Sequence, residues 1–137
     1  MDIRLGGVAL MLAVALVSQG CAAGTAGHSV NYTLDGVAYR TFSAPLDQLQ
    51  RITLTTFKRM DLALKSDAVK DDGCREMVAA AGDRTVHVEL EKLSARTTRM
   101  RITAKQGWLW RDRAAAGEII AQTERSLGDS AVSQRVK

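Results

Sequence analysis

Alternation of apolar and polar residues in two neighbouring stretches is the sequence feature that most constrains the fold. In residues 85–93 apolar residues alternate with acidic residues and a histidine: Val86, His87, Val88, Glu89, Leu90 and Glu91. In residues 98–104 they alternate with polar ones: Arg99, Met100, Arg101, Ile102, Thr103 and Ala104. A period of two with one apolar and one polar face is typical of strands in an antiparallel sheet that is covered on a single side.

Turn residues divide the rest of the chain into further elements. Strands are expected at residues 37–42, 62–69 and 74–80, where Asp35-Gly36 precedes the first strand and residues 70–73 and 81–83 form turns. Helical spacing of apolar residues predicts a helix from Pro45 to Met60. A second helix is predicted after Asp112, a candidate N-cap, with Gly128 as its C-cap.

This order of elements, β-α-β-β-β-β-α, predicts an α+β fold. We expect a two-layer sandwich in which two helices pack on one face of an antiparallel sheet. Residues 32–128 form this single domain, and residues 129–137 are expected to be a polar tail. A chain of 137 residues is long enough to bury such a core without disulfides.

The first 21 residues have the pattern of an export signal. An apolar run of about a dozen residues follows Arg4, which is too short for a transmembrane helix but fits the ~7–15 residues of a signal core. Residues 1–20 are therefore predicted to be a signal peptide, with Cys21 as the site of lipid attachment and residues 21–31 as a flexible tether. Two alternatives are ordinary cleavage after Ala23 and an uncleaved anchor.

Lipid on Cys21 would make the membrane a partner of the protein and hold the chain there durably. The leader resembles those of bacterial lipoproteins generally, and by that resemblance Ala22 after the cysteine implies the periplasmic face of the outer membrane and not the inner membrane. The alternative location is the periplasm.

Charge and motifs exclude several classes of function. The formal charge is +4, but basic and acidic residues are interleaved, so no nucleic-acid-binding surface is predicted. No phosphate-binding glycine loop, catalytic triad or cofactor motif is recognisable, so neither an enzyme nor a cofactor is expected. The sequence does not specify the oligomeric state.

Three residues on one predicted strand face, His87, Glu89 and Glu91, have side chains that can bind metal. The interpretation we favour is a solvent-facing strand surface that is balanced by Arg99 and Arg101 on the next strand. Cys74, the second of the two cysteines, is expected to be a half-buried strand residue.

Two tryptophans beside two arginines form the candidate interaction surface, which comprises Trp108, Trp110, Arg111 and Arg113. Aromatic residues next to basic ones are typical of a bilayer interface or a protein contact. The competing interpretation is that one or both tryptophans close the end of the core.

Residues 39–127 combine a short first strand, the helix from Pro45 to Met60, a sheet rich in hairpins, and a strand (Arg101-Ile102-Thr103) that leads through a glycine-containing loop into a helix. This arrangement resembles a family of small bacterial lipoproteins defined only as a domain of unknown function. The resemblance implies an N-terminal lipoprotein signal, in agreement with the interpretation of Cys21. It implies no catalytic residues.

These observations predict where the protein acts and that it is an interaction module, but they predict no ligand or reaction. The chain is expected to be a membrane-anchored lipoprotein whose domain is a non-catalytic module that contacts an envelope protein or the membrane. The alternative is a soluble periplasmic protein that binds a small or anionic ligand. A third and weaker hypothesis is a hydrolase or metal enzyme that uses the face of His87.

Overall fold

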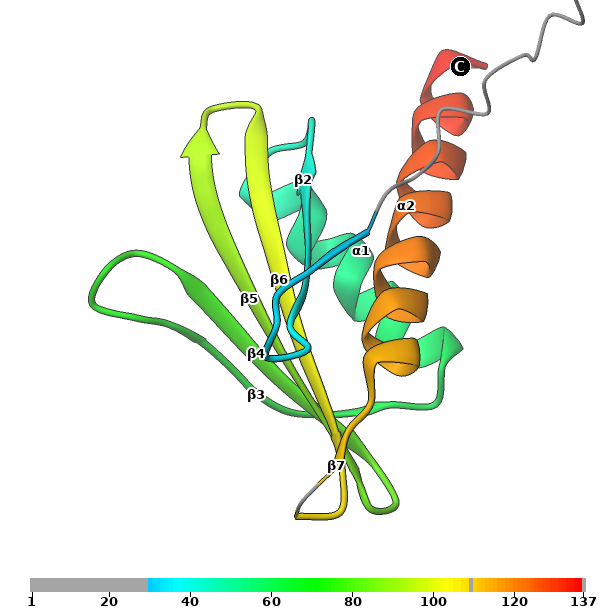
Figure 1. Ribbon diagram of the computed structural model, residues 1–137. Coiled ribbons are helices and arrows are strands. Elements are labelled where there is room, and N and C mark those ends of the chain that lie inside the picture. The colour runs from blue at the N-terminus through cyan, green and yellow to red at the C-terminus, as the bar shows by residue number, and fades with distance from the viewer. Residues whose placement is uncertain (1–29, 109, 137) are drawn as a thin grey trace, which may run out of the picture.

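The computed structural model describes residues 30–108 and 110–136 of the chain (Figure 1). The strands are β1 (Asn31–Tyr32), β2 (Ala38–Phe42), β3 (Ala63–Val69), β4 (Arg75–Ala81), β5 (Arg84–Ser94), β6 (Thr97–Gln106) and β7 (Trp110–Arg111). The helices are α1 (Leu46–Arg59) and α2 (Arg113–Arg135). The predicted signal, Cys21 and residues 22–29 of the predicted tether lie outside the described residues.

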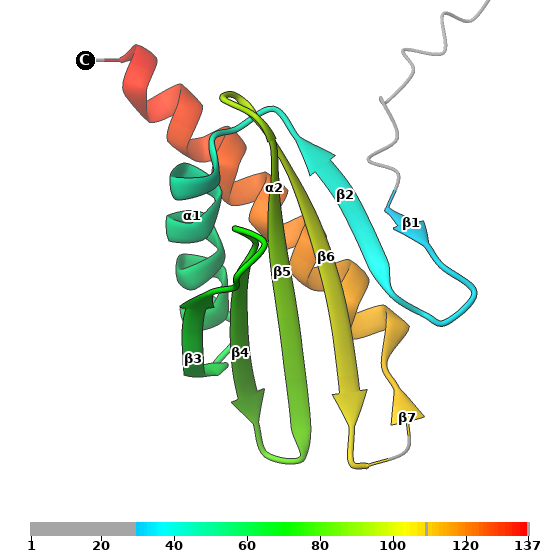
Figure 2. The same cartoon turned by 90° about the vertical axis from the view of Figure 1, so that its left-hand side faces the viewer.

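All strands belong to one antiparallel sheet, in the order β1-β2-β6-β5-β4-β3, and β7 also pairs with β6. Both helices lie on the same face of this sheet, so that its other face is open to solvent (Figure 2). The predicted α+β sandwich is thus confirmed. Two short strands, β1 and β7, were not predicted because two residues carry no periodicity.

The core lies between the sheet and the helices. Eight residues of β4, β5 and β6 face this core and are at most 1% exposed: Met77, Ala79, Val86, Val88, Leu90, Met100, Ile102 and Ala104. Ala38 and Phe42 of β2 extend the same layer. On β5 and β6 the period of two therefore assigned the core-facing residues to the correct face.

Helix α1 begins after Pro45, whose extended backbone suits the position just before a helix. Its buried stripe faces the sheet and α2, and comprises Leu49, Ile52, Thr53, Thr56 and Phe57. The Thr123 hydroxyl of α2 donates to the Thr56 hydroxyl at 3.4 Å, and the Arg59 guanidinium donates to the Ser126 hydroxyl at 2.9 Å.

Helix α2 begins as predicted, because the Asp112 side chain accepts a hydrogen bond from the backbone N–H of Ala115 at 2.9 Å. Its end was predicted wrongly. The helix continues through Gly128 to Arg135, so most of the expected polar tail is helical. Gly128 does not have the positive φ that a helix-ending glycine adopts, and the polar residues after it are compatible with a helix.

Candidate functional site

The tryptophans of the candidate interaction surface lie at one end of the sheet. The β6–β7 turn reverses the chain so that β7 pairs with Lys105 and Gln106, beyond the part of β6 that β2 covers. The side chains of Trp108 and Trp110 are 91% and 72% exposed. The interpretation that they close the core is therefore wrong, because β7 continues past the end of the packed layers.

The two arginines of this surface, Arg111 and Arg113, hold the β1–β2 turn beside the β6–β7 turn. The Arg111 side chain donates to the carbonyl oxygen of Asp35, and the Arg113 side chain donates to that of Leu34 at 3.0 Å. Figure 2 shows the resulting arrangement, in which the β1–β2 turn lies beside β7 and the start of α2. Both guanidinium groups thus join two turns that are far apart in the sequence.

Gly36 allows this close approach. Its φ is +77°, and a Cβ atom at this position would lie 3.0 Å from Nε of Arg113. A side chain there would be strained by the backbone conformation and would push the arginine away. The turn dipeptide Asp35-Gly36 is therefore also a contact point for Arg113.

Leu34 is the residue of this site that the sequence did not reveal. Its side chain is 99% exposed, at the turn that Arg111 and Arg113 hold beside β7. A large apolar residue directly before a turn dipeptide is a weak signal, and a single exposed leucine needs no explanation. We call Leu34, Trp108 and Trp110 the apolar tip.

The face of the sheet opposite to the helices carries charged and hydroxyl side chains. Arg99 of β6 forms an ion pair with Glu91 of β5 at 3.2 Å, as the cross-strand balance predicted. Nδ1 of His87 lies 3.9 Å from a carboxylate oxygen of Glu76. Within residues 30–108 and 110–136, no group of three or more histidine, cysteine or acidic side chains is arranged to hold a metal ion.

The Cys74 thiol is half-buried at the turn before β4, one residue outside the strand in which it was predicted. Burial, together with the nearby carboxylate of Asp72, raises the pKa of this thiol. A thiol with a raised pKa is a poor nucleophile near neutral pH, because the thiolate is the reactive form.

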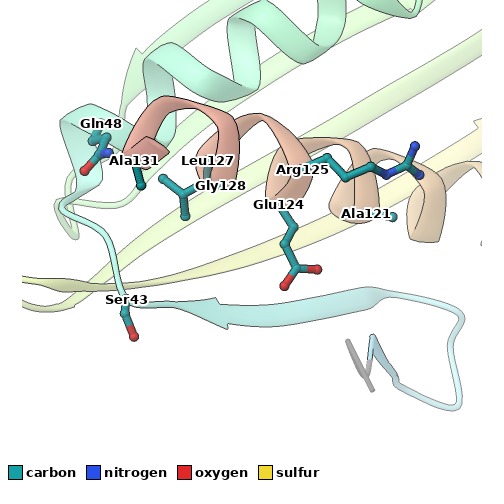
Figure 3. Close-up of a pocket in the computed structure, with 8 residues that line it drawn as sticks. All are labelled: Ser43, Gln48, Ala121, Glu124, Arg125, Leu127, Gly128 and Ala131. Atoms are coloured by element: carbon teal, nitrogen blue, oxygen red, sulfur yellow. The ribbon is translucent and has the colours of Figure 1, made fainter. Parts of the chain in front are cut away.

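A groove of about 800 Å³ runs between the C-terminal half of α2 and the segment that joins β2 to α1 (Figure 3). Its walls are mainly apolar and small, and its lining residues are Ser43, Gln48, Ala121, Glu124, Arg125, Leu127, Gly128 and Ala131. Glu124 accepts a hydrogen bond from Arg40 of β2 at 2.5 Å, which ties the strand to the helix beside the groove.

No helix in the described part of the chain is long and apolar enough to cross a membrane.

Residues 7–126 match the model of the family described as "Protein of unknown function (DUF3568)". The chain belongs to this family. The predicted resemblance to a family of unknown function is thereby confirmed, whereas the lipoprotein character of the DUF3568 family stays a prediction. No curated protein matches the chain.

The DUF3568 match extends from within the apolar run that follows Arg4 to Ser126 of α2. It therefore includes Cys21, the apolar tip and every strand of the sheet. The last turns of α2, with Gly128 and Ala131 of the groove, lie beyond it.

Proposed function

We propose that this DUF3568 protein is an exported, lipid-anchored envelope protein whose folded domain is a non-catalytic interaction module. Cys21 carries the lipid, and the apolar tip lies against the surface of the bilayer. The observation that carries this proposal is the exposure of Leu34 on the β1–β2 turn and of Trp108 and Trp110 on the adjacent β6–β7 hairpin. Arg111 and Arg113 hold the β1–β2 turn beside β7, so the three residues lie at the same end of the sheet.

Tryptophan is the side chain best suited to the boundary between lipid and water, because its ring is apolar while its indole N–H can still find a polar partner. Each Å² of apolar surface removed from water contributes roughly 25 cal/mol. A bilayer can cover all three side chains of the tip at once without requiring a complementary shape. An envelope protein is the other surface that could do so, and the experiment below distinguishes the two.

The length of the chain supports contact with the membrane that holds the lipid. From Val30 to Leu34 the backbone spans at most about 14 Å, and residues 22–29 add at most about 28 Å. The tip is therefore within reach of the bilayer in which the lipid of Cys21 is inserted. Tethering raises the effective concentration of the tip at that surface, so a weak contact is sufficient.

The location that follows from Ala22 is the periplasmic face of the outer membrane. The apolar run from Gly7 and Cys21 both fall within the family match, which supports treating the leader and the domain as one unit.

Tryptophan fluorescence tests the proposal directly, because Trp108 and Trp110 are the only tryptophans in the chain. We expect that the full-length lipidated protein, reconstituted in vesicles, loses tryptophan emission when the vesicles contain brominated lipids. The matched control is a variant in which the only tryptophan lies away from the apolar tip. It combines Trp108→Phe, Trp110→Phe and Val69→Trp. Val69 is 62% exposed at the end of β3, on the opposite edge of the sheet.

Emission from the control should be unaffected by brominated lipids. Equal quenching of both proteins, or of neither, would exclude a membrane contact through the tip. If quenching is absent and a photo-reactive group at Trp108 crosslinks to an envelope protein, the tip is a protein contact instead.

A further inference from the structure

The open face of the sheet contains a hollow that lies outside the apolar tip. It has a volume of about 380 Å³ and is lined by Thr33, Tyr39, Thr41, Arg99 and Arg101. Each of these side chains carries an O–H or N–H donor, and none is a carboxylate. We propose that this hollow binds a phosphate group.

Pairing of β2 with β6 brings the donors together. Tyr39 is opposite Arg101 and Thr41 is opposite Arg99 in the antiparallel register. All four alternate with residues that face the core or α2, so they lie on the face that the helices leave open. Paired residues in such a ladder have Cα atoms about 4.5–5.5 Å apart, which allows one small anion to contact both rows. Thr33, from the β1–β2 turn, closes one side.

The guanidinium groups of Arg99 and Arg101 differ in how far they are free to bind an anion. Arg99 shares its charge with Glu91, but this pair is 41% and 37% exposed and is therefore weak. Arg101 is exposed, and its side chain forms no ion pair or hydrogen bond with other residues of 30–108 and 110–136. Glu89 is opposite Arg101 on β5, and both residues line the neighbouring hollow, whereas Glu89 does not line this one. The hollow thus contains two guanidinium groups, of which one has no ion-pair partner among the described residues and the other can be shared with Glu91.

Phosphate suits these groups because a guanidinium can donate two parallel hydrogen bonds to its oxygens. The hydroxyls of Tyr39, Thr41 and Thr33 provide neutral donors around the same space. Phosphate binding at this hollow does not depend on attachment of the protein to the membrane. The phosphate can come from a soluble phosphate compound or from a lipid headgroup, since Thr33 directly precedes Leu34 of the apolar tip.

The test uses two probes with the full-length protein, observed by the backbone amide resonances of Tyr39, Thr41 and Arg101. Inorganic phosphate is the soluble probe, added to the protein in uncharged detergent micelles. The lipid probe is phosphatidic acid in phosphatidylcholine nanodiscs, compared with phosphatidylcholine alone. We expect saturable shifts with at least one probe, with a dissociation constant on the order of 1 mM for inorganic phosphate.

Arg101→Gln should weaken this binding about tenfold, because it removes a charged donor. Arg96→Gln is the matched control: Arg96 is exposed at the β5–β6 turn, and its replacement removes the same charge away from the hollow. It should change binding less than about twofold, and both variants should unfold as the wild type does.

Tyr39→Phe, which leaves the charge unchanged, should weaken binding about threefold, the effect of one neutral hydrogen bond. Shifts with phosphate alone identify a soluble ligand, and shifts with phosphatidic acid alone identify a headgroup. The proposal is overturned if neither probe shifts these resonances, or if Arg96→Gln weakens binding as much as Arg101→Gln.

Discussion

At the scale of single residues, the arginines of this domain differ in what they do because they differ in what surrounds them. Arg111 and Arg113 donate to carbonyl oxygens of the β1–β2 turn and thereby fix the position of Leu34. Arg75 of β4 instead donates to the Asp67 carboxylate on β3 at 2.6 Å, and Gln50 of α1 donates to the second oxygen at 2.8 Å. A local sequence cannot distinguish these roles, because the partner lies on another element in each case.

The carboxylate of Asp67 is expected to stabilise the fold in a pH-dependent way. The hydrogen bond from Arg75 lowers its pKa below the ordinary value of 3.8. Because the folded pKa is the lower one, the stabilisation is fully present above the ordinary value and is lost as the pH falls below it. We expect Asp67→Asn to lower the free energy of unfolding by about 1–2 kcal/mol at neutral pH. Near pH 3 the difference from wild type should shrink.

Urea unfolding at the two pH values measures this change. Asp71→Asn is the control, because Asp71 is exposed at the β3–β4 turn. A destabilisation by Asp67→Asn that is equal at both pH values would show that the charge of Asp67 is not the cause.

At the scale of elements, helix α2 packs on the sheet along its first part and is exposed to solvent along its last turns. It is about 35 Å long, and its buried positions end at Ser126. The rest of the helix extends past the sheet, where Val132 is 63% exposed (Figure 1). Small residues on this helix leave room for neighbours: the Tyr32 side chain of β1 lies against Gly117, and Gly128 opens into the groove.

The two interior glycines of α2 should respond differently to alanine. Gly128→Ala should raise the free energy of unfolding by about 0.5–1 kcal/mol, since alanine favours the helix and nothing lies within 4 Å of the added Cβ. At Gly117 the Cβ would lie 2.2 Å from the tyrosine hydroxyl oxygen, so Tyr32 would have to move. Gly117→Ala should therefore gain less stability or lose it.

Thermal and urea unfolding of the two variants provide the measurement. If Gly117→Ala stabilises the protein as much as Gly128→Ala does, the contact between Tyr32 and α2 contributes nothing to stability.

At the scale of the whole molecule, the apolar tip and the start of the folded domain are close along the chain. The β1–β2 turn that carries Leu34 follows β1 directly, so the tether would leave the domain near the tip. The open face of the sheet, with its hydroxyl and guanidinium groups, adjoins the same turn through Thr33. This geometry is compatible with a domain that rests on the membrane surface and has a polar face available beside it.

Lipid attachment can be separated from contact through the tip. In cells labelled with a fatty-acid analogue, we expect the wild type and the variant Trp108→Ala, Trp110→Ala to incorporate label and to sediment with membranes. Cys21→Ala should lose the label and much of its membrane association, because several acyl chains bind far more strongly than one small apolar surface. Equal, unlabelled protein in the wild type and Cys21→Ala would rule out lipidation and favour ordinary cleavage after Ala23.

Local sequence patterns were sufficient to predict the core-facing residues of β5 and β6 and the positions of most elements. Alternation assigned Val86, Val88 and Ile102 correctly, and Asp112 identified the start of α2. These features are local, since the period of a strand or a cap depends only on neighbouring residues. The end of α2 was missed because polar residues after Gly128 are compatible with either a helix or a tail.

The exposed surfaces depend instead on contacts between elements that are far apart in the sequence. Exposure of Trp108 and Trp110 follows from the pairing of β7 beyond the end of β2, and Leu34 joins them through Arg111 and Arg113. The hollow on the open face likewise requires that β2 lies beside β6, a strand far away in the sequence. The period of the apolar residues predicts whether a side chain is buried. Long-range strand pairing determines which residues lie beside it, and a binding surface is formed by residues that different elements bring together.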